Sequence, residues 1–258
     1  MKYLLKLSYC GTDFCGFQVQ PNANTVQAEL MRAAEKIFTV PCKITGCSRT
    51  DSGVHALEYF ATLEPADGGA SISAEKLPRA LGSVLPKSIA VMAAKNVPDD
   101  FAVRRAVEGK EYSYVIWAQP HGNPFLADRA WHYTKPLDLH KMNEAARYIV
   151  GKHDFASFMA SGSDIEDTVR NVTRCEAVRE SDGTVRIYVA ADGFLYNMVR
   201  IIAGTLMEVG RGAIEPAQMK AILSACDRSK AGPTAPPEGL TLVRYQILGG
   251  KSDKNMKK

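Results

Sequence analysis

The order of hydrophobic and polar residues predicts strands and helices through the first hundred residues. Residues 2–9 alternate as a strand does, with tyrosine or leucine at each odd position on one face. Apolar residues then recur at helical spacing over 26–38, behind Thr25, a residue type that caps helix N-termini. Further strands are expected over 43–45, 57–63 and 88–97, and a second helix over 74–85. The resulting β-α-β-β-α-β order is that of a ferredoxin-like or RNA-recognition-type sandwich.

The second half is expected to have a similar order of strands and helices, although no sequence repeat is evident. Strands are expected over 110–117, from 168 onward, and over 185–191 and 238–245; helices are expected over 137–150, 195–209 and 216–225. We predict an α+β fold with two ferredoxin-like (RRM-like) α/β halves, at 1–104 and 105–248. A disordered basic tail is expected over 249–258.

Composition adds limits on the class of protein. The 258 residues are 46% hydrophobic and 23% charged, as in a soluble globular protein. Lys and Arg number 32 against 28 Asp and Glu, so the net charge is only +4, and a nucleic-acid partner would require cations gathered on one face. We expect a cytoplasmic protein, since no apolar run has the length of a membrane span and charge interrupts the amino terminus early.

The cysteines raise the possibility of a metal site. Cys10 and Cys15 are separated by four residues, as are Cys42 and Cys47, and His55 is near in sequence. This spacing is at the edge of that of structural zinc sites, but both pairs span expected strand-to-loop transitions rather than tight turns. We therefore expect buried, reduced cysteines and no metal.

The segment from Gly46 to Ala56, which reads GCSRTDSGVHA, is the strongest candidate for chemistry. Its glycines allow the backbone to approach a ligand closely. Arg49 and Asp51 are two residues apart, so in an extended segment both side chains project to the same side. The pair alone is more often an ordinary turn salt bridge, and binding of a shared ligand is the alternative.

The whole string resembles the signature G-x-G-R-T-D-x-G-V-H of the TruA family of tRNA pseudouridine synthases, with Ser48 in place of the usual Gly. Residues 9–20 are similar to the family's Y-D-G-T-x-F-x-G-W/F-Q-x-Q loop, with Cys10 in place of Asp. Similar motifs follow in the family's order at 101–106, 110–117, 151–158, 194–204 and 238–245. In one of them, Asn197 replaces the commoner His. The resemblance covers residues 2 to about 246.

The resemblance implies an isomerase that converts uridine to pseudouridine in the anticodon arm of tRNA, at positions 38 to 40. It implies that Asp51 is the catalytic aspartate, that Arg49 is its charged neighbour, and that Tyr112 stacks on the target base and is a proposed proton acceptor. Arg200, Arg170 and Leu240 are implied to bind substrate, and His153 and Asp154 are implied to hold a turn rather than to act as acid or base. The two sheets would meet at a central catalytic cleft carrying Asp51. A homodimer is implied, and neither metal nor organic cofactor is needed.

The chemistry agrees with a single acid. Cleavage of the N1–C1′ bond builds positive charge at C1′, which one ionised carboxylate can stabilise or bond covalently. Acylal formation and elimination to a glycal both remain open. A non-catalytic RNA-binding protein on the same fold predicts loss of the aspartate, yet Asp51 is present. A hydrolytic glycosidase would need a second placed carboxylate, and the nearest downstream acid, Glu58, falls inside an expected strand.

Overall fold

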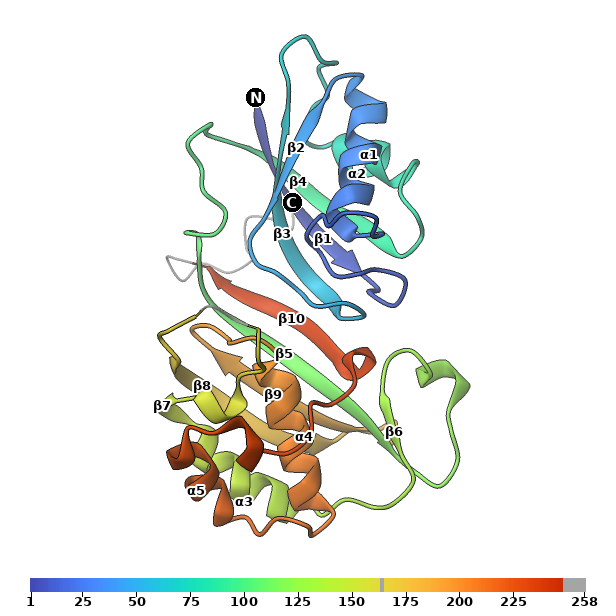
Figure 1. Ribbon diagram of the computed structural model, residues 1–258. Coiled ribbons are helices and arrows are strands. Elements are labelled where there is room, and N and C mark those ends of the chain that lie inside the picture. The colour runs from blue at the N-terminus through green and yellow to red at the C-terminus, as the bar shows by residue number, and fades with distance from the viewer. Residues whose placement is uncertain (163–164, 248–258) are drawn as a thin grey trace. The chain divides into compact units, whose positions relative to one another are not determined.

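The computed structural model describes residues 1–162 and 165–247, so the predicted tail over 249–258 lies outside the described residues. The chain forms two compact units (Figure 1): Met1–Glu108 together with the residues from Leu242, and Gly109–Thr241. The last strand, β10 (Leu240–Ile247), was expected in the second half. Most of its residues belong instead with the first unit, where β10 pairs with β3.

The first unit has the predicted β-α-β-β-α-β order. Its elements are β1 (Lys2–Tyr9), α1 (Val26–Phe38), β2 (Cys42–Gly46), β3 (His55–Pro65), α2 (Leu77–Gly82) and β4 (Ile89–Val97). β1 lies between β4 and β3, and β2 pairs with the carboxyl-terminal part of β3, all antiparallel. Figure 1 shows α1 and α2 on the same face of this sheet.

Local chemistry explains where the two helices begin. The side chain of Thr25 accepts a hydrogen bond from the backbone N–H of Ala28, which caps α1 as predicted. The helix expected over 74–85 is shorter, and α2 has Pro78 in its first turn. Proline lacks a backbone N–H and is tolerated at a helix start, so it marks the beginning of α2. Residues 74–76 before it form a turn.

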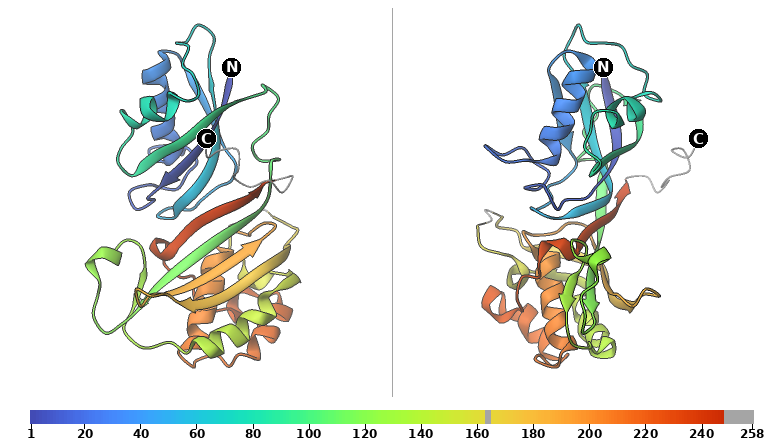
Figure 2. Two further views of the ribbon diagram at one scale, coloured as in Figure 1. Left: turned by 180° about the vertical axis from the view of Figure 1, so that it is seen from behind. Right: turned by 90° about the vertical axis from the view of Figure 1, so that its right-hand side faces the viewer.

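The second unit is also built from strands and helices. Its strands are β5 (Val107–Ala118), β6 (Trp131–Tyr133), β7 (Gly151–Asp154), β8 (Val169–Arg179) and β9 (Val185–Ala191), and its α-helices are α3 (Leu139–Ile149), α4 (Met198–Gly210) and α5 (Gln218–Ala225). Short 3₁₀ turns η1 to η4 cover Pro124–Leu126, Ala156–Phe158, Arg228–Lys230 and Pro237–Gly239. The strand order is β5-β9-β8-β7. The strands β8 and β9 are nearer the viewer than α4 when the unit is seen from behind (Figure 2, left). Each unit thus combines β-strands with α-helices, and the α+β class is confirmed.

Two short strands were absent from the prediction. β6 pairs with β5 in parallel over three residues, too few for a hydrophobic pattern to be seen. β7 was expected to be part of a turn, but it pairs with β8 as a strand. The expected turn follows directly after it. In that turn, Asp154 Oδ1 accepts hydrogen bonds from the Ala156 N–H and the Thr168 hydroxyl. These bonds, the Thr168 one above all, lower the pKa of the Asp154 carboxyl, and they give this residue the architectural role expected of it.

Candidate active site

The segment between β2 and β3, residues 47–54, forms a loop that we call the aspartate loop. Asp51 is half-buried in it, and Gly53 has a φ of 77°. Two backbone hydrogen bonds tie this loop to the preceding loop of residues 10–20: Gly53 N donates to Phe14 O at 3.1 Å, and Phe17 N donates to Thr50 O at 3.3 Å. The backbone that carries Asp51 is thus braced by a segment more than thirty residues away.

Two glycines allow the loops to approach so closely. A Cβ at Gly11 would lie 2.0 Å from Val54 O, and one at Gly16 would lie 2.5 Å from Thr50 O. No side chain can occupy either space, so glycine is required at both contacts. His55, which the cysteine spacing raised as a possible metal ligand, is buried and accepts a hydrogen bond from Gly11 N through Nδ1 at 3.0 Å. Its role is to hold the loops together.

Aromatic rings support the aspartate loop from within the first unit. Phe17 stacks on Tyr59 with ring centroids 4.3 Å apart, and the Tyr59 hydroxyl donates to the carbonyl oxygen of Ser48. Ser48 is the position where the family signature has glycine. Its hydroxyl lies 2.6 Å from the Tyr245 hydroxyl on β10, so the added polar group is paired and fits the packing.

Arg49 lies exposed on the aspartate loop. Its Nε donates to the side-chain oxygen of Gln18 at 2.7 Å, across to the neighbouring loop. The pattern alone favoured a turn salt bridge with Asp51, and the structure instead gives this guanidinium a neutral acceptor. A neutral partner leaves the positive charge of Arg49 available to a ligand.

Tyr112 lies on β5 in the second unit. It is buried, and its ring meets Phe194 edge-on at a centroid distance of 5.3 Å. Tyr114, two residues on, is fully buried and donates its hydroxyl to Pro236 O at 2.8 Å. Burial raises the pKa of Tyr114, with the nearby Glu238 adding to the effect, so this phenol stays neutral and serves packing.

Arg200 lies in the first turn of α4 and is held by two acceptors. Its Nε donates to Ala235 O at 2.7 Å, and its Nη1 donates to Asn197 Oδ1 at 2.8 Å. Asn197 has a φ of 58°, a left-handed conformation that asparagine tolerates better than most residues. Asn197 was noted only as a departure from the family motif, where His is commoner, and nothing in the sequence pointed to its contact with Arg200.

The remaining predicted residues also lie in the second unit. Arg170, near the start of β8, donates through Nη1 to Val169 O at 2.6 Å and passes close to Gly193, where an added Cβ would lie 3.4 Å from its Nε. Leu240 is buried at the start of β10. Its neighbour Gly239 must be small, because a Cβ there would lie 2.6 Å from the Tyr114 ring.

The link between β9 and α4, residues 192–197, contacts three of the predicted site residues. Phe194 meets Tyr112, Gly193 lies beside Arg170, and Asn197 holds Arg200. The structure therefore gathers these three around one segment of the second unit. Arg49 and Asp51 share one loop of the first unit.

Residues 1–162 and 165–247 contain no group of three or more His, Cys, Asp or Glu side chains able to hold a metal ion. The expectation of buried cysteines is wrong for Cys15 and Cys226, which are exposed at the surface of loops and helix ends, whereas burial raises the pKa of Cys42 to about 11. No helix in the described part of the chain combines the length and hydropathy of a membrane span.

Known proteins resemble this chain over nearly its whole length. The family model described as tRNA pseudouridine synthase matches residues 7–104 and 145–246. A protein named tRNA pseudouridine synthase A from Thermoanaerobacter sp. (strain X514) is 43% identical over 241 residues, which are 93% of this chain and 97% of that protein. One of the same name from Bacillus pumilus (strain SAFR-032) is 45% identical over 246 residues, 94% of this chain and 97% of that protein.

Among solved structures, a chain described as "Crystal Structure of a Cbf5-Nop10-Gar1 Complex" is 12% identical, with a TM-score of 0.39 over 93% of this chain and 57% of that one. That likeness is too low to support a conclusion. The family model and the relatives are sufficient, and they confirm the prediction of an isomerase that acts on tRNA. On these matches, the chain belongs to the tRNA pseudouridine synthase family.

Proposed function

We propose that this chain converts uridine to pseudouridine in the anticodon arm of tRNA, at positions 38 to 40, with Asp51 acting at C1′ of a nucleotide turned out of the stack. The observation that carries the proposal is the braced aspartate loop, which holds a half-buried carboxylate beside Arg49 in a chain of this family. A preorganised carboxylate is suited to stabilise positive charge that develops in the transition state.

The reaction is an isomerisation and needs no second substrate. The N1–C1′ bond breaks, the uracil rotates, and a C5–C1′ bond forms. The hydrogen on C5 leaves as a proton, and N1 gains one. In one route Asp51 bonds to C1′ as the N1–C1′ bond breaks, and it leaves when C5 bonds to C1′. In the other it stabilises the charge at C1′ while the C2′ proton is removed to give a glycal, and that proton returns to C2′ when the C5–C1′ bond forms. Both routes use one ionised acid.

The other site residues are proposed to bind the RNA. Tyr112 stacks on the extruded uracil and is a candidate acceptor for the C5 proton, since aromatic faces are the usual supports for unstacked bases. Arg200 and Arg170 bind phosphate oxygens. Leu240 packs near the base. The neutral acceptors that orient Arg200 leave its charge uncompensated by them, which supports this assignment.

The two other hypotheses are less well supported. A glycosidase would need a second free carboxylate, but Glu58 is held by Lys6 at 2.7 Å and accepts from the Tyr245 N–H at 3.2 Å. A pure RNA-binding module would not need the braced carboxylate at all.

We further propose a homodimer that acts in the cytoplasm, on the family resemblance alone. Sedimentation equilibrium tests the dimer, and a monomer at working concentration would refute it.

The direct test is release of tritium from tRNA labelled at uracil C5, because C5 loses its hydrogen when it becomes the glycosidic carbon. The wild type is expected to release tritium, and Asp51→Asn is expected to release none while still binding RNA. Asp13→Asn is the matched control, since Asp13 is an exposed acid on the neighbouring loop, and it should keep wild-type release. A folded wild type that releases nothing from unmodified tRNA would overturn the proposal.

A further inference from the structure

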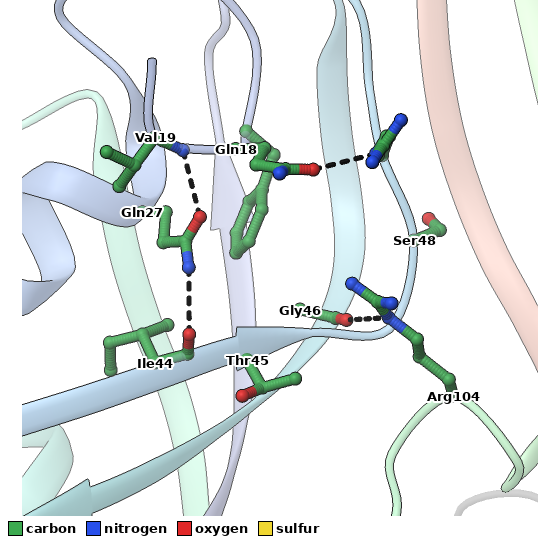
Figure 3. A pocket seen from close by; sticks show the side chains of 10 residues that line it. Gln18, Val19, Gln27, Ile44, Thr45, Gly46, Ser48 and Arg104 are labelled. Carbon is green, nitrogen blue, oxygen red and sulfur yellow. Dashed lines mark hydrogen bonds between the residues drawn. The ribbon is translucent and has the colours of Figure 1, made fainter. Parts of the chain in front are cut away.

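A pocket opens beside the aspartate loop on the first unit (Figure 3). Its volume is about 240 Å³, and its wall includes Phe17, Gln18, Gly46, Ser48, Arg49 and Arg104. Arg49 comes from the aspartate loop, and Arg104 comes from the segment after β4. Two guanidinium groups from distant parts of the chain therefore border one small space.

Neither arginine is neutralised by the protein around it. Arg49 Nε donates to the side-chain oxygen of Gln18 at 2.7 Å, and Arg104 Nε donates to Gly46 O at 3.3 Å (Figure 3). Within residues 1–162 and 165–247, no carboxylate forms an ion pair with either. Both anchors are neutral and engage Nε, so the charge and the terminal nitrogens of each guanidinium remain for a ligand.

Two further polar side chains of the wall, those of Gln27 and Ser48, are already paired. Gln27 accepts from the Val19 N–H at 2.9 Å and donates to Ile44 O at 2.8 Å, which joins the loop before α1 to β2 at this wall (Figure 3). The Ser48 hydroxyl is paired with that of Tyr245. The charged donors of the wall are those of the two arginines, and the Thr45 hydroxyl and the Gln18 amide add neutral ones. Such a pocket selects an anionic acceptor with several oxygens, and a phosphate meets this need.

We infer that this pocket binds a backbone phosphate of the RNA strand, next to the nucleotide on which Asp51 acts. Arg49 is two residues from Asp51, and two residues span at most about 7 Å of chain. The pocket is thus within reach of a neighbouring nucleotide. Gln18 acts as a positioning residue, because it orients Arg49 toward this pocket. The inference rests on the proposed function for the identity of the strand.

The test compares Arg104→Gln with Arg105→Gln. Arg105 is the matched control because it is adjacent and exposed, carries the same charge, and does not line the pocket. The dissociation constant for unmodified tRNA is measured across a range of salt concentrations. Arg104→Gln is expected to weaken binding about tenfold, as the loss of a charge-assisted hydrogen bond would. The slope of log K against log salt should become shallower by about 0.7, and Arg105→Gln should change neither quantity.

A second variant tests the pocket without removing an arginine. Gln18→Glu places a carboxylate against Arg49 and is expected to weaken binding in the same direction, whereas Gln20→Glu, an exposed neighbour outside the wall, should not. Equal affinity and slope for Arg104→Gln and the wild type would overturn the inference. The proposed function would still stand if Asp51→Asn abolished tritium release. Conversely, a wild type without tritium release would overturn the proposed function while leaving this binding comparison intact.

Discussion

Arg200 shows how two acceptors hold a single side chain in place. Its guanidinium is anchored by Ala235 O and by Asn197 Oδ1, so its direction is set without a ligand, as the proposed role in RNA binding requires. Preorganised charge avoids the entropy loss of ordering a long side chain at the moment of binding. Asn197 serves this end in two ways, because it supplies the acceptor and also adopts the left-handed backbone conformation that begins α4.

The two roles of Asn197 can be separated by substitution. Asn197→Gly keeps the backbone freedom and removes the acceptor, so we expect unchanged thermal stability and a lower kcat/KM, about tenfold, from a less ordered Arg200. Asn197→Ala loses both and should also be destabilised by about 1 kcal/mol or slightly more. Calorimetry and tritium-release kinetics measure the two effects. Wild-type kcat/KM in Asn197→Gly would show that the bond to Arg200 is dispensable.

At the scale of elements, the aspartate loop depends on the loop before α1. The backbone bonds to Phe14 and Phe17 and the close contacts at Gly11 and Gly16 join them into one structure. Rigid support matters for the role proposed for Asp51, since a small displacement of a catalytic group lowers the rate steeply. The family motif of residues 9–20 therefore has a structural explanation, namely the support of Asp51 by a neighbouring segment.

Gly16→Ala tests this dependence, with Gly68→Ala as the control. Both glycines have a left-handed φ, of 82° and 83°, but only Gly16 would push a Cβ against Thr50 O, whereas Gly68 has open space. We expect Gly68→Ala to lose about 1 kcal/mol of stability and to keep its activity. Gly16→Ala should lose more stability and most activity, because the loops are forced apart. Equal effects in urea unfolding would contradict the contact.

At the scale of the whole molecule, the two compact units are not consecutive pieces of chain. The chain leaves the first unit after Glu108 and returns to it at Leu242. On its return, β10 pairs with β3, and Tyr245 contacts both Ser48 and Glu58. The last described strand thus completes the unit that carries Asp51.

Truncation tests this arrangement. A chain ending at Thr241 should lose cooperative unfolding of the first unit or unfold at a markedly lower temperature, since β3 loses a neighbouring strand and Glu58 loses its backbone donor. A chain ending at Ile247 is the control and should unfold as the full chain does. Identical melting curves for all three chains, followed by circular dichroism, would show that β10 adds nothing to this unit.

The sequence by itself determined those features that depend on near neighbours. The bounds of β1, α1 and β9 were predicted, because periodicity and the Thr25 cap act within a few residues. The string around Asp51 indicated the family, since the motif that carries the resemblance is one short segment. The bounds of α2 were less well predicted, because proline and tertiary packing compete with helical periodicity there.

Only the tertiary structure decided the contacts between residues far apart in the chain. The partners Gln18 for Arg49, Tyr245 for Ser48 and Asn197 with Ala235 for Arg200 could not be read from spacing. The same is true of β10 on β3 and of the short strands β6 and β7. The physical reason is that such contacts depend on how the chain folds back on itself, and burial and polar pairing settle that choice over the whole unit at once.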